Sequence, residues 1–126
     1  MAVTLLEGMS VYRIQAEVAD EIYEIVYQWK FFDRDTIGLQ LVRAFDSIGA
    51  NIAEGFGRYH YGDKIKFYYY ARGSAFESQY WIKRARARKL FLEDQSRTYL
   101  LIIQQILKEL NLIIKSCKNE KMNTKS

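Results

Sequence analysis

Residues 43–58 read RAFDSIGANIAEGFGR, and this stretch decides the fold. At helical spacing its apolar side chains form one stripe with those just before it, because positions three and four apart share a face. That stripe consists of Ile37, Leu41, Phe45, Ile48, Ile52 and Phe56. A second, wholly polar stripe consists of Gln40, Arg43, Ser47, Asn51, Glu54 and Arg58. The stretch therefore predicts a helix with one buried face and one row of groups able to pair across a contact.

A seam of small residues lies between the two stripes. It consists of Gly49, Ala50, Ala53 and Gly57. An ordinary surface helix needs only an apolar face and a solvated one, whereas this seam also allows another backbone to come close. We therefore expect this helix to join other helices.

Composition favours a single helical domain in the cytoplasm. The chain has 126 residues, no proline and only 7 glycines, which suits one domain of long helices with short connections. No apolar run is long enough to span a membrane, and the N-terminus MAVTLLEGMS lacks the basic start of a signal peptide. The single cysteine, Cys117, cannot form an internal disulfide and fits a reducing compartment. We expect its thiol to be a small buried group in the last helix.

Three further segments carry helical periodicity. Together with the stretch above they predict helices at about 10–30, 36–57, 63–89 and 95–117, and a polar tail at 118–126 that we expect to fray. The segment FFDRD at 31–35 is expected to separate the first two helices, with Asp33 or Asp35 capping the second. Four amphipathic helices with short loops predict an all-α, antiparallel up-down four-helix bundle.

The third predicted helix has more apolar surface than one bundle core can hide. One face is mostly small and suits the seam described above; it consists of Phe67, Ala71, Ser74, Ala75, Ser78, Ile82 and Ala85. The other face consists of Ile65, Tyr69, Arg72, Phe76 and Tyr80. Exposed aromatic patches mark interfaces, so we expect a homo-oligomer.

Charge is divided unevenly along the chain. Residues 1–57 hold 4 basic and 9 acidic side chains, whereas residues 58–126 hold 15 basic and 6 acidic ones. The two halves can attract each other, within a subunit or between subunits, or the second half can bind anions. The charge count alone does not choose between these alternatives.

The densest group of cations reads KRARARK at residues 83–89, which we call the basic segment. Its cations are Lys83, Arg84, Arg86, Arg88 and Lys89. The helix dipole favours cations at a helix C-terminus, but five in seven residues exceed that need. The basic segment is therefore a candidate nucleic-acid surface. We expect the late lysines Lys115, Lys118, Lys121 and Lys125 to extend it.

Aromatic residues in the loop before the third helix are candidates for stacking on unpaired bases. They are Tyr59, His60 and Tyr61. Stacking on aromatic rings is how many proteins hold single strands. The alternative is that these rings pack locally, as loop aromatics often do.

The polar stripe has a catalytic and a structural interpretation. In the first, Glu54 and Glu77 form a pair of carboxylates for acid–base work. In the second, which we favour, polar groups satisfy one another where helices or subunits meet. This structural network consists of Arg43, Ser47, Asn51, Glu54, Arg58, Arg72 and Glu77. The sequence thus predicts no catalytic residue.

Metal and cofactor sites are not predicted either. A di-metal site in a bundle needs Glu-x-x-His pairs, and the one histidine, His60, lies outside any such spacing. A zinc site is not expected from one cysteine and one histidine far apart in the sequence.

The residues assembled above resemble a known family. The pattern SIxxNIAEGxGR at 47–58, followed by an aromatic-rich segment and ARGSxxES at 71–78, is similar to bacterial four-helix-bundle proteins of 23S rRNA intervening sequences. These proteins are often labelled ribosomal-protein-like, and the resemblance covers residues 10–117. It implies a left-handed bundle that assembles into a ring, usually a homopentamer. The accessory proteins of diversity-generating retroelements are distantly similar and are associated with nucleic acid and reverse transcriptase.

These observations predict a non-enzymatic, cytoplasmic oligomer that binds nucleic acid, RNA rather than DNA. Sequence specificity should be low because no RNA-recognition module is present. The alternative is a structural or adaptor oligomer whose partner is another protein. We expect no membrane partner and no cofactor.

Overall fold

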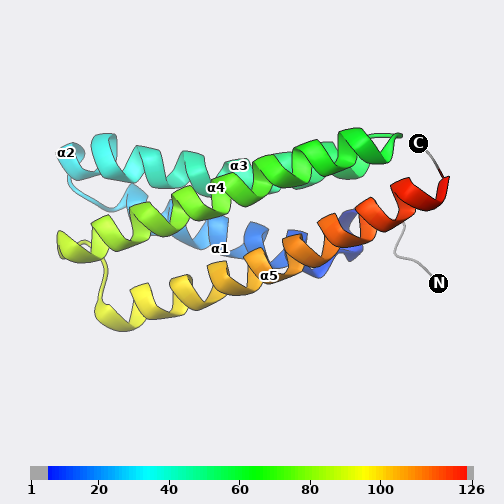
Figure 1. The fold of residues 1–126 in the computed structure, drawn as a ribbon. Coiled ribbons are helices and arrows are strands. Elements are labelled where there is room, and N and C mark those ends of the chain that lie inside the picture. Colours follow the sequence, from blue (N-terminus) through cyan, green and yellow to red (C-terminus); the bar gives the residue numbers. More distant parts are fainter. Residues whose placement is uncertain (1–5, 125–126) are drawn as a thin grey trace.

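The structure, a computed structural model, describes residues 6–124, which contain helices and no strand. Four long helices lie side by side, and successive ones run in opposite directions (Figure 1). They are α1 (Ser10–Tyr27), α3 (Leu39–Gly57), α4 (Tyr61–Ala87) and α5 (Glu93–Thr124). Because α1 and α4 each pack against both α3 and α5, these two helices lie diagonally across a four-helix bundle.

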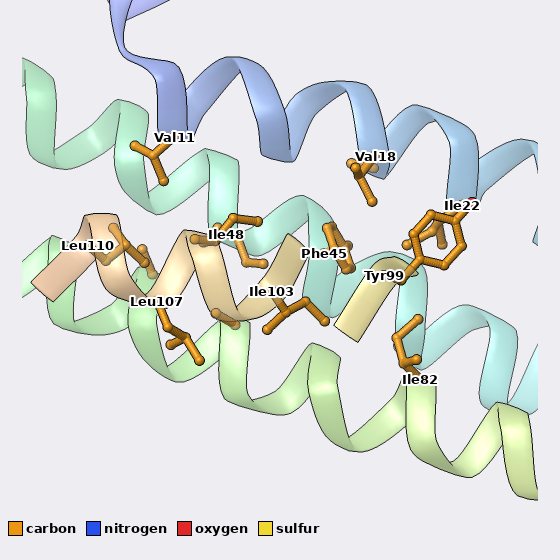
Figure 2. Close-up of a cluster of buried hydrophobic side chains, with 14 of the residues drawn as sticks. Val11, Val18, Ile22, Phe45, Ile48, Ile82, Tyr99, Ile103, Leu107 and Leu110 are labelled. Carbon is orange, nitrogen blue, oxygen red and sulfur yellow. The ribbon is translucent and has the colours of Figure 1, made fainter. Parts of the chain in front are cut away.

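The core consists of the apolar stripes that the periodicity predicts. On α3 and just before it, Ile37, Leu41, Phe45, Ile48 and Ile52 are at most 2% exposed. Side chains of α1, α4 and α5 converge on the same interior (Figure 2). Each fully buried side chain of this size contributes about 1.5–3 kcal/mol, so these stripes account for much of the stability of the bundle.

Two buried serine hydroxyls, one in α4 and one in α5, donate to backbone carbonyl oxygens four residues earlier in the chain. The hydroxyl of Ser78 donates to the carbonyl oxygen of Ser74, and that of Ser96 to the carbonyl oxygen of Leu92, both at 2.8 Å. Cys117 is buried in α5, as predicted. The core thus tolerates small polar side chains because none of these hydroxyls is left without an acceptor.

The break between the first two helices lies at residues 28–30, before the segment 31–35 where it was predicted. The chain is already helical at α2 (Phe31–Asp33) and continues through η2 (Arg34–Gly38), a π-helical stretch that leads directly into α3. Neither Asp33 nor Asp35 caps α3 through its side chain. A wider π turn takes up an extra residue without ending the helix, and Thr36 Oγ1 donates to the carbonyl oxygen of Phe32 at 2.6 Å.

The end of α5 also differs from the prediction. Helix continues through the polar segment as far as Thr124 instead of fraying after residue 117. Lysine and glutamate are good helix formers, and Lys118 gains a contact with the ring of Tyr69, its Nζ 5.3 Å from the ring centroid. The other ends shift by a few residues, and a short 3₁₀ turn, η1 (Leu6–Gly8), precedes α1.

Candidate nucleic-acid interface

The basic segment lies at the C-terminal end of α4, at one end of the bundle (Figure 1). Lys83, Arg88 and Lys89 are exposed there, and Arg84 and Arg86 are half-buried. Among its cations only Arg86 has a described carboxylate within 4 Å, with Nε 3.9 Å from Glu93 Oε1. Most of the positive charge of the basic segment is therefore not neutralised within the subunit.

The backbone at the end of α4 turns through Lys89. This residue has a φ of 63°, in the left-handed region that glycine usually occupies at helix ends. Its N–H donates to the carbonyl oxygen of Arg86 at 3.0 Å, and the N–H of Leu90 donates to that of Ala85 at 2.9 Å. Together these bonds form a Schellman motif, which leaves the cations around the negative end of the helix dipole.

An aromatic side chain, Tyr80, lies beside the basic segment. Its side chain is 54% exposed, and the guanidinium carbon of Arg84 lies 5.8 Å from its ring centroid. Trp81 meets Tyr80 edge to face at 4.9 Å and donates from Nε1 to Glu77 Oε2 at 3.1 Å. Sequence reasoning assigned Tyr80 to a self-association face. Its position four residues before Arg84 is the signal in the sequence that places its ring beside this cation.

The loop aromatics lie at the opposite end of the bundle. Tyr59 is 88% exposed at the turn between α3 and α4, and its ring meets that of His60 edge to face at 5.0 Å. Together with Tyr61, Lys64 and Thr124 they line a pocket of about 290 Å³. Because α4 has 27 residues, about 40 Å separates this turn from the basic segment. Tyr59 and Tyr61 therefore cannot join the basic segment in one site of a single subunit.

The late lysines lie toward that same opposite end, so the prediction that they extend the basic segment is wrong. Because α5 runs antiparallel to α4, its C-terminal half lies near the start of α4 (Figure 1). Lys125 lies outside the described residues. We call the combined group the turn-end surface; it consists of Arg58, Tyr59, His60, Tyr61, Lys64, Lys115, Lys118 and Lys121.

Several cations of the turn-end surface have partners within the subunit. Lys64 Nζ donates to the carbonyl oxygens of Gly55 and Phe56, at 3.3 and 2.8 Å, and so caps the C-terminus of α3. Arg58 Nη2 lies 2.9 Å from Glu54 Oε2, and its guanidinium carbon lies 4.7 Å from the ring centroid of Phe67. Because these cations already have partners within the subunit, they are less available to an external anion.

The electrostatics of the turn-end surface follow from these contacts. A hydrogen bond from Lys118 lowers the pKa of Tyr69. Burial raises the pKa of the Cys117 thiol, and the nearby Lys64 ammonium opposes that shift. Burial likewise raises the pKa of Tyr68 to about 12. The Cys117 thiol and the Tyr68 hydroxyl therefore both stay protonated near neutral pH.

The predicted polar network exists only as separate parts within the subunit. Ser74 Oγ donates to Ser47 Oγ at 3.0 Å, and Asn51 Nδ2 donates to the carbonyl oxygen and hydroxyl of Ser47 at 2.9 and 3.1 Å. Arg72 Nη1 instead donates to Asn111 Oδ1 at 3.0 Å, which links α4 to α5. Arg43 is exposed and has no described hydrogen-bond or ion-pair partner in the subunit.

Glu54 and Glu77 do not form a pair of carboxylates. The contact between Ser47 and Ser74 fixes the antiparallel register of α3 and α4. From that contact Glu54 is seven residues along α3 and Glu77 three residues along α4, in opposite directions. About ten residues of helix, or about 15 Å, therefore separate them.

Within the described residues, 6–124, neither a metal site nor a membrane-spanning helix is found. No three of their His, Cys, Asp or Glu side chains are grouped so that they could hold a metal ion. None of the helices in this range combines the length and apolar character needed to cross a membrane.

Comparisons with known proteins agree with the fold. The model of the family described as 23S rRNA-intervening sequence protein matches residues 7–112. A crystal structure of a protein of unknown function from the S23 ribosomal protein family of Bacteroides thetaiotaomicron is 27% identical, with a TM-score of 0.74. The similarity covers 83% of this chain and 95% of that one. No curated protein matches.

Proposed function

The chain belongs to the family of 23S rRNA-intervening sequence proteins, and we propose that it is a non-enzymatic, self-associating protein that binds nucleic acid. RNA is the preferred partner, with low sequence specificity, and the basic segment makes the contact. The lone buried thiol suits the reducing cytoplasm, where we expect the protein to act.

The observation that carries this proposal is the unneutralised charge of the basic segment. Lys83, Arg88 and Lys89 project from the end of α4, and the nearest described carboxylate contact in the segment is the loose one from Arg86 to Glu93. Phosphate backbones bind such clusters because contact releases the counterions condensed on the nucleic acid. The contact carries no sequence information of its own, hence the low specificity.

Tyr80 supports single-stranded RNA as the form that binds best. An exposed ring beside cations allows an unpaired base to stack while its phosphate meets the basic segment. Bases within a duplex are already stacked and do not offer a free face.

We also propose that the subunits form a ring-like homo-oligomer, a homopentamer by the family resemblance. Support comes from the large aromatic side chains that a single subunit leaves exposed, among them Tyr23, Tyr27, Phe31 and Phe76. A ring repeats the basic segment and raises its affinity for one long strand.

The test is a titration of labelled single-stranded RNA, duplex RNA and single-stranded DNA with the full chain at several salt concentrations. The proposal expects the tightest binding to single-stranded RNA and a steep loss of affinity with salt. The double variant Arg88→Ala/Lys89→Ala should bind at least about ten-fold more weakly. Its matched control, Lys115→Ala/Lys121→Ala, removes two exposed lysines at the other end of the bundle and should bind like the wild type.

Absence of binding to all three nucleic acids at low salt would overturn the nucleic-acid proposal and favour the structural or adaptor role. Equal losses in both double variants would mean that net charge, and not the basic segment, determines affinity.

A further inference from the structure

A groove on the outer side of α1 and α3 has an unusual lining. It measures about 270 Å³ and includes the small residues Ala16, Ala50 and Ala53. Asp20 and Asp46 also line it, one from each helix. Three of the four residues of the small seam predicted on α3, Gly49, Ala50 and Ala53, thus line this groove beside α1. The expected fit of the seam to the small face of α4 is therefore wrong for these three residues.

The groove also contains a buried acceptor without a donor. Gln15 is 4% exposed, and its Oε1 has no hydrogen-bond partner. The amide of Gln15 lies directly over Gly49, where a Cβ atom would stand only 2.1 Å from Nε2. A buried oxygen left unpaired costs about 1–3 kcal/mol, so a site that keeps one is expected to meet a donor when occupied.

The carboxylates of Asp20 and Asp46 also need hydrogen-bond donors or cations from a molecule bound in the groove. The pKa of Asp46 is raised, first by burial and then by the negative charge of Asp20. Neither aspartate has a described cation within 4 Å, and an RNA phosphate would be repelled here. The groove therefore suits a helix that carries N–H donors and positive charge.

The outer face of α4 offers such a helix. Lys66, Gly73 and Phe76 share this face at helical spacing, and all three are exposed. Beside them the guanidinium carbon of Arg72 lies 4.8 Å from the ring centroid of Tyr69. A Cβ atom added to Gly73 would meet nothing within 4 Å in the subunit, so packing of the single chain does not explain this glycine.

We infer that the outer face of α4 in one copy of the chain docks in the α1–α3 groove of a second copy. The inference rests on the proposed self-association and names the two faces that form it. Gly73 and the groove alanines allow the helices to approach closely, Phe76 fills the groove, and Lys66 and Arg72 meet Asp20 and Asp46.

The geometry makes this contact heterologous. α1 and α4 lie diagonally across the bundle, so the two faces point away from each other on one subunit (Figure 1). A two-fold contact of either face with itself would oppose like charges, whereas head-to-tail docking pairs unlike ones. The basic segment begins about two turns beyond Phe76 and stays free for RNA.

The experiment is size-exclusion chromatography with light scattering, without nucleic acid, on the wild type and three variants. Gly73→Gln puts a long side chain on the docking face, and Asp20→Asn/Asp46→Asn removes the charge of the groove. Each should raise the dissociation constant of the assembly at least about ten-fold. Gly57→Gln is the matched control, because that glycine also has open space around it but lies outside both faces.

Thermal melting separates docking from folding. Gly73→Gln should melt no lower than the wild-type subunit, because glutamine is the better helix former. The aspartate variant should melt slightly higher at neutral pH. A raised folded-state pKa means that the charged form of Asp46 is disfavoured in the fold at any pH above its unfolded pKa, and the amide removes that penalty.

Assembly retained by either face variant, or lost equally in Gly57→Gln, would overturn the assignment of the faces and leave the RNA proposal standing. A wild type that stays monomeric at all concentrations would overturn the self-association itself, while RNA titration would still decide the nucleic-acid proposal.

Discussion

The two ends of the bundle contain the same kinds of residue but use them differently. At the turn-end surface, Lys64 and Arg58 are held by carbonyl oxygens, a carboxylate and a ring of their own subunit. At the basic segment, Arg88 and Lys89 face solvent without such partners. The number of cations therefore does not identify a binding surface. What matters is how many cations the fold leaves unneutralised.

The difference has a cause in the backbone. The turn between α3 and α4 exposes the last carbonyl groups of α3, and Lys64 satisfies two of them. The end of α4 closes instead through its own backbone, in the Schellman motif at Lys89. Side chains near a helix end that caps itself are free for other contacts.

The largest effect that sharpens this comparison is expected at Gly55. A Cβ atom there would lie 2.8 Å from the ring of buried Tyr68, so the turn end is tightly packed. Gly55→Ala should lower the free energy of unfolding by about 2 kcal/mol, as overpacking does. Urea unfolding measures the free energy of unfolding of this variant and of Gly57→Ala. The space around Gly57 is open, so its alanine variant should be as stable as the wild type or more stable. Equal costs at both glycines would contradict the difference in packing.

A matched pair of aromatic variants compares the two ends for RNA binding. Tyr80→Ala should weaken binding to single-stranded RNA about ten-fold, because one stacked base is lost. Tyr59→Ala removes an even more exposed ring at the turn end and should have little effect. Fluorescence anisotropy with an unstructured oligonucleotide measures both. The reverse order of effects would move the interface to the turn-end surface.

Lys64 tests whether turn-end cations serve the fold. Lys64→Met keeps the apolar stem but removes both hydrogen bonds. The carbonyl oxygen of Gly55 still accepts from the N–H of Arg58, whereas that of Phe56 loses its donor, so the free energy of unfolding should fall by about 1 kcal/mol. The control Lys121→Met removes an exposed ammonium nearby and should change stability little. Chemical denaturation measures the free energy of unfolding of both variants. If Lys64→Met unfolds with the same free energy as the wild type, the ammonium of Lys64 does not stabilise the fold and is available to ligands.

The smallest effect is expected at Lys89, and it separates backbone from charge. Lys89→Gly relieves a left-handed backbone conformation and should stabilise the subunit by about 0.5–1 kcal/mol. The same change removes one cation from the basic segment and should weaken RNA binding. Higher stability with lower affinity is the expected combination, measured by melting and titration. A less stable Lys89→Gly variant would contradict the interpretation that the left-handed conformation at Lys89 is strained.

The sequence predicted the fold well because burial repeats at helical spacing. Stripes such as Leu41, Phe45 and Ile48 leave little choice about which face is inside. The π-helical stretch was missed because Asp33 and Asp35 resemble caps, and only the packed structure shows that the helix continues. The helical end of α5 was missed because polar composition resembles a tail.

The sites were harder to predict because they depend on register between distant helices. The basic segment is contiguous and was visible in the sequence, whereas its separation from Tyr59, Tyr61 and the late lysines depends on the antiparallel packing of α4 and α5. The polar stripe of α3 was visible too. The partner of each side chain in that stripe depends on the register of α3 against α4, as the contact of Ser47 with Ser74 shows.

The most direct test of the RNA interface is the salt dependence of binding. The logarithm of the association constant for single-stranded RNA should fall linearly with the logarithm of salt concentration in the wild type. Removing two phosphate contacts with Arg88→Ala/Lys89→Ala should make that slope shallower by about 1.4, and Lys115→Ala/Lys121→Ala should leave it unchanged. A slope unchanged by the first variant, or lowered equally by both, would contradict the basic segment as the RNA-binding surface.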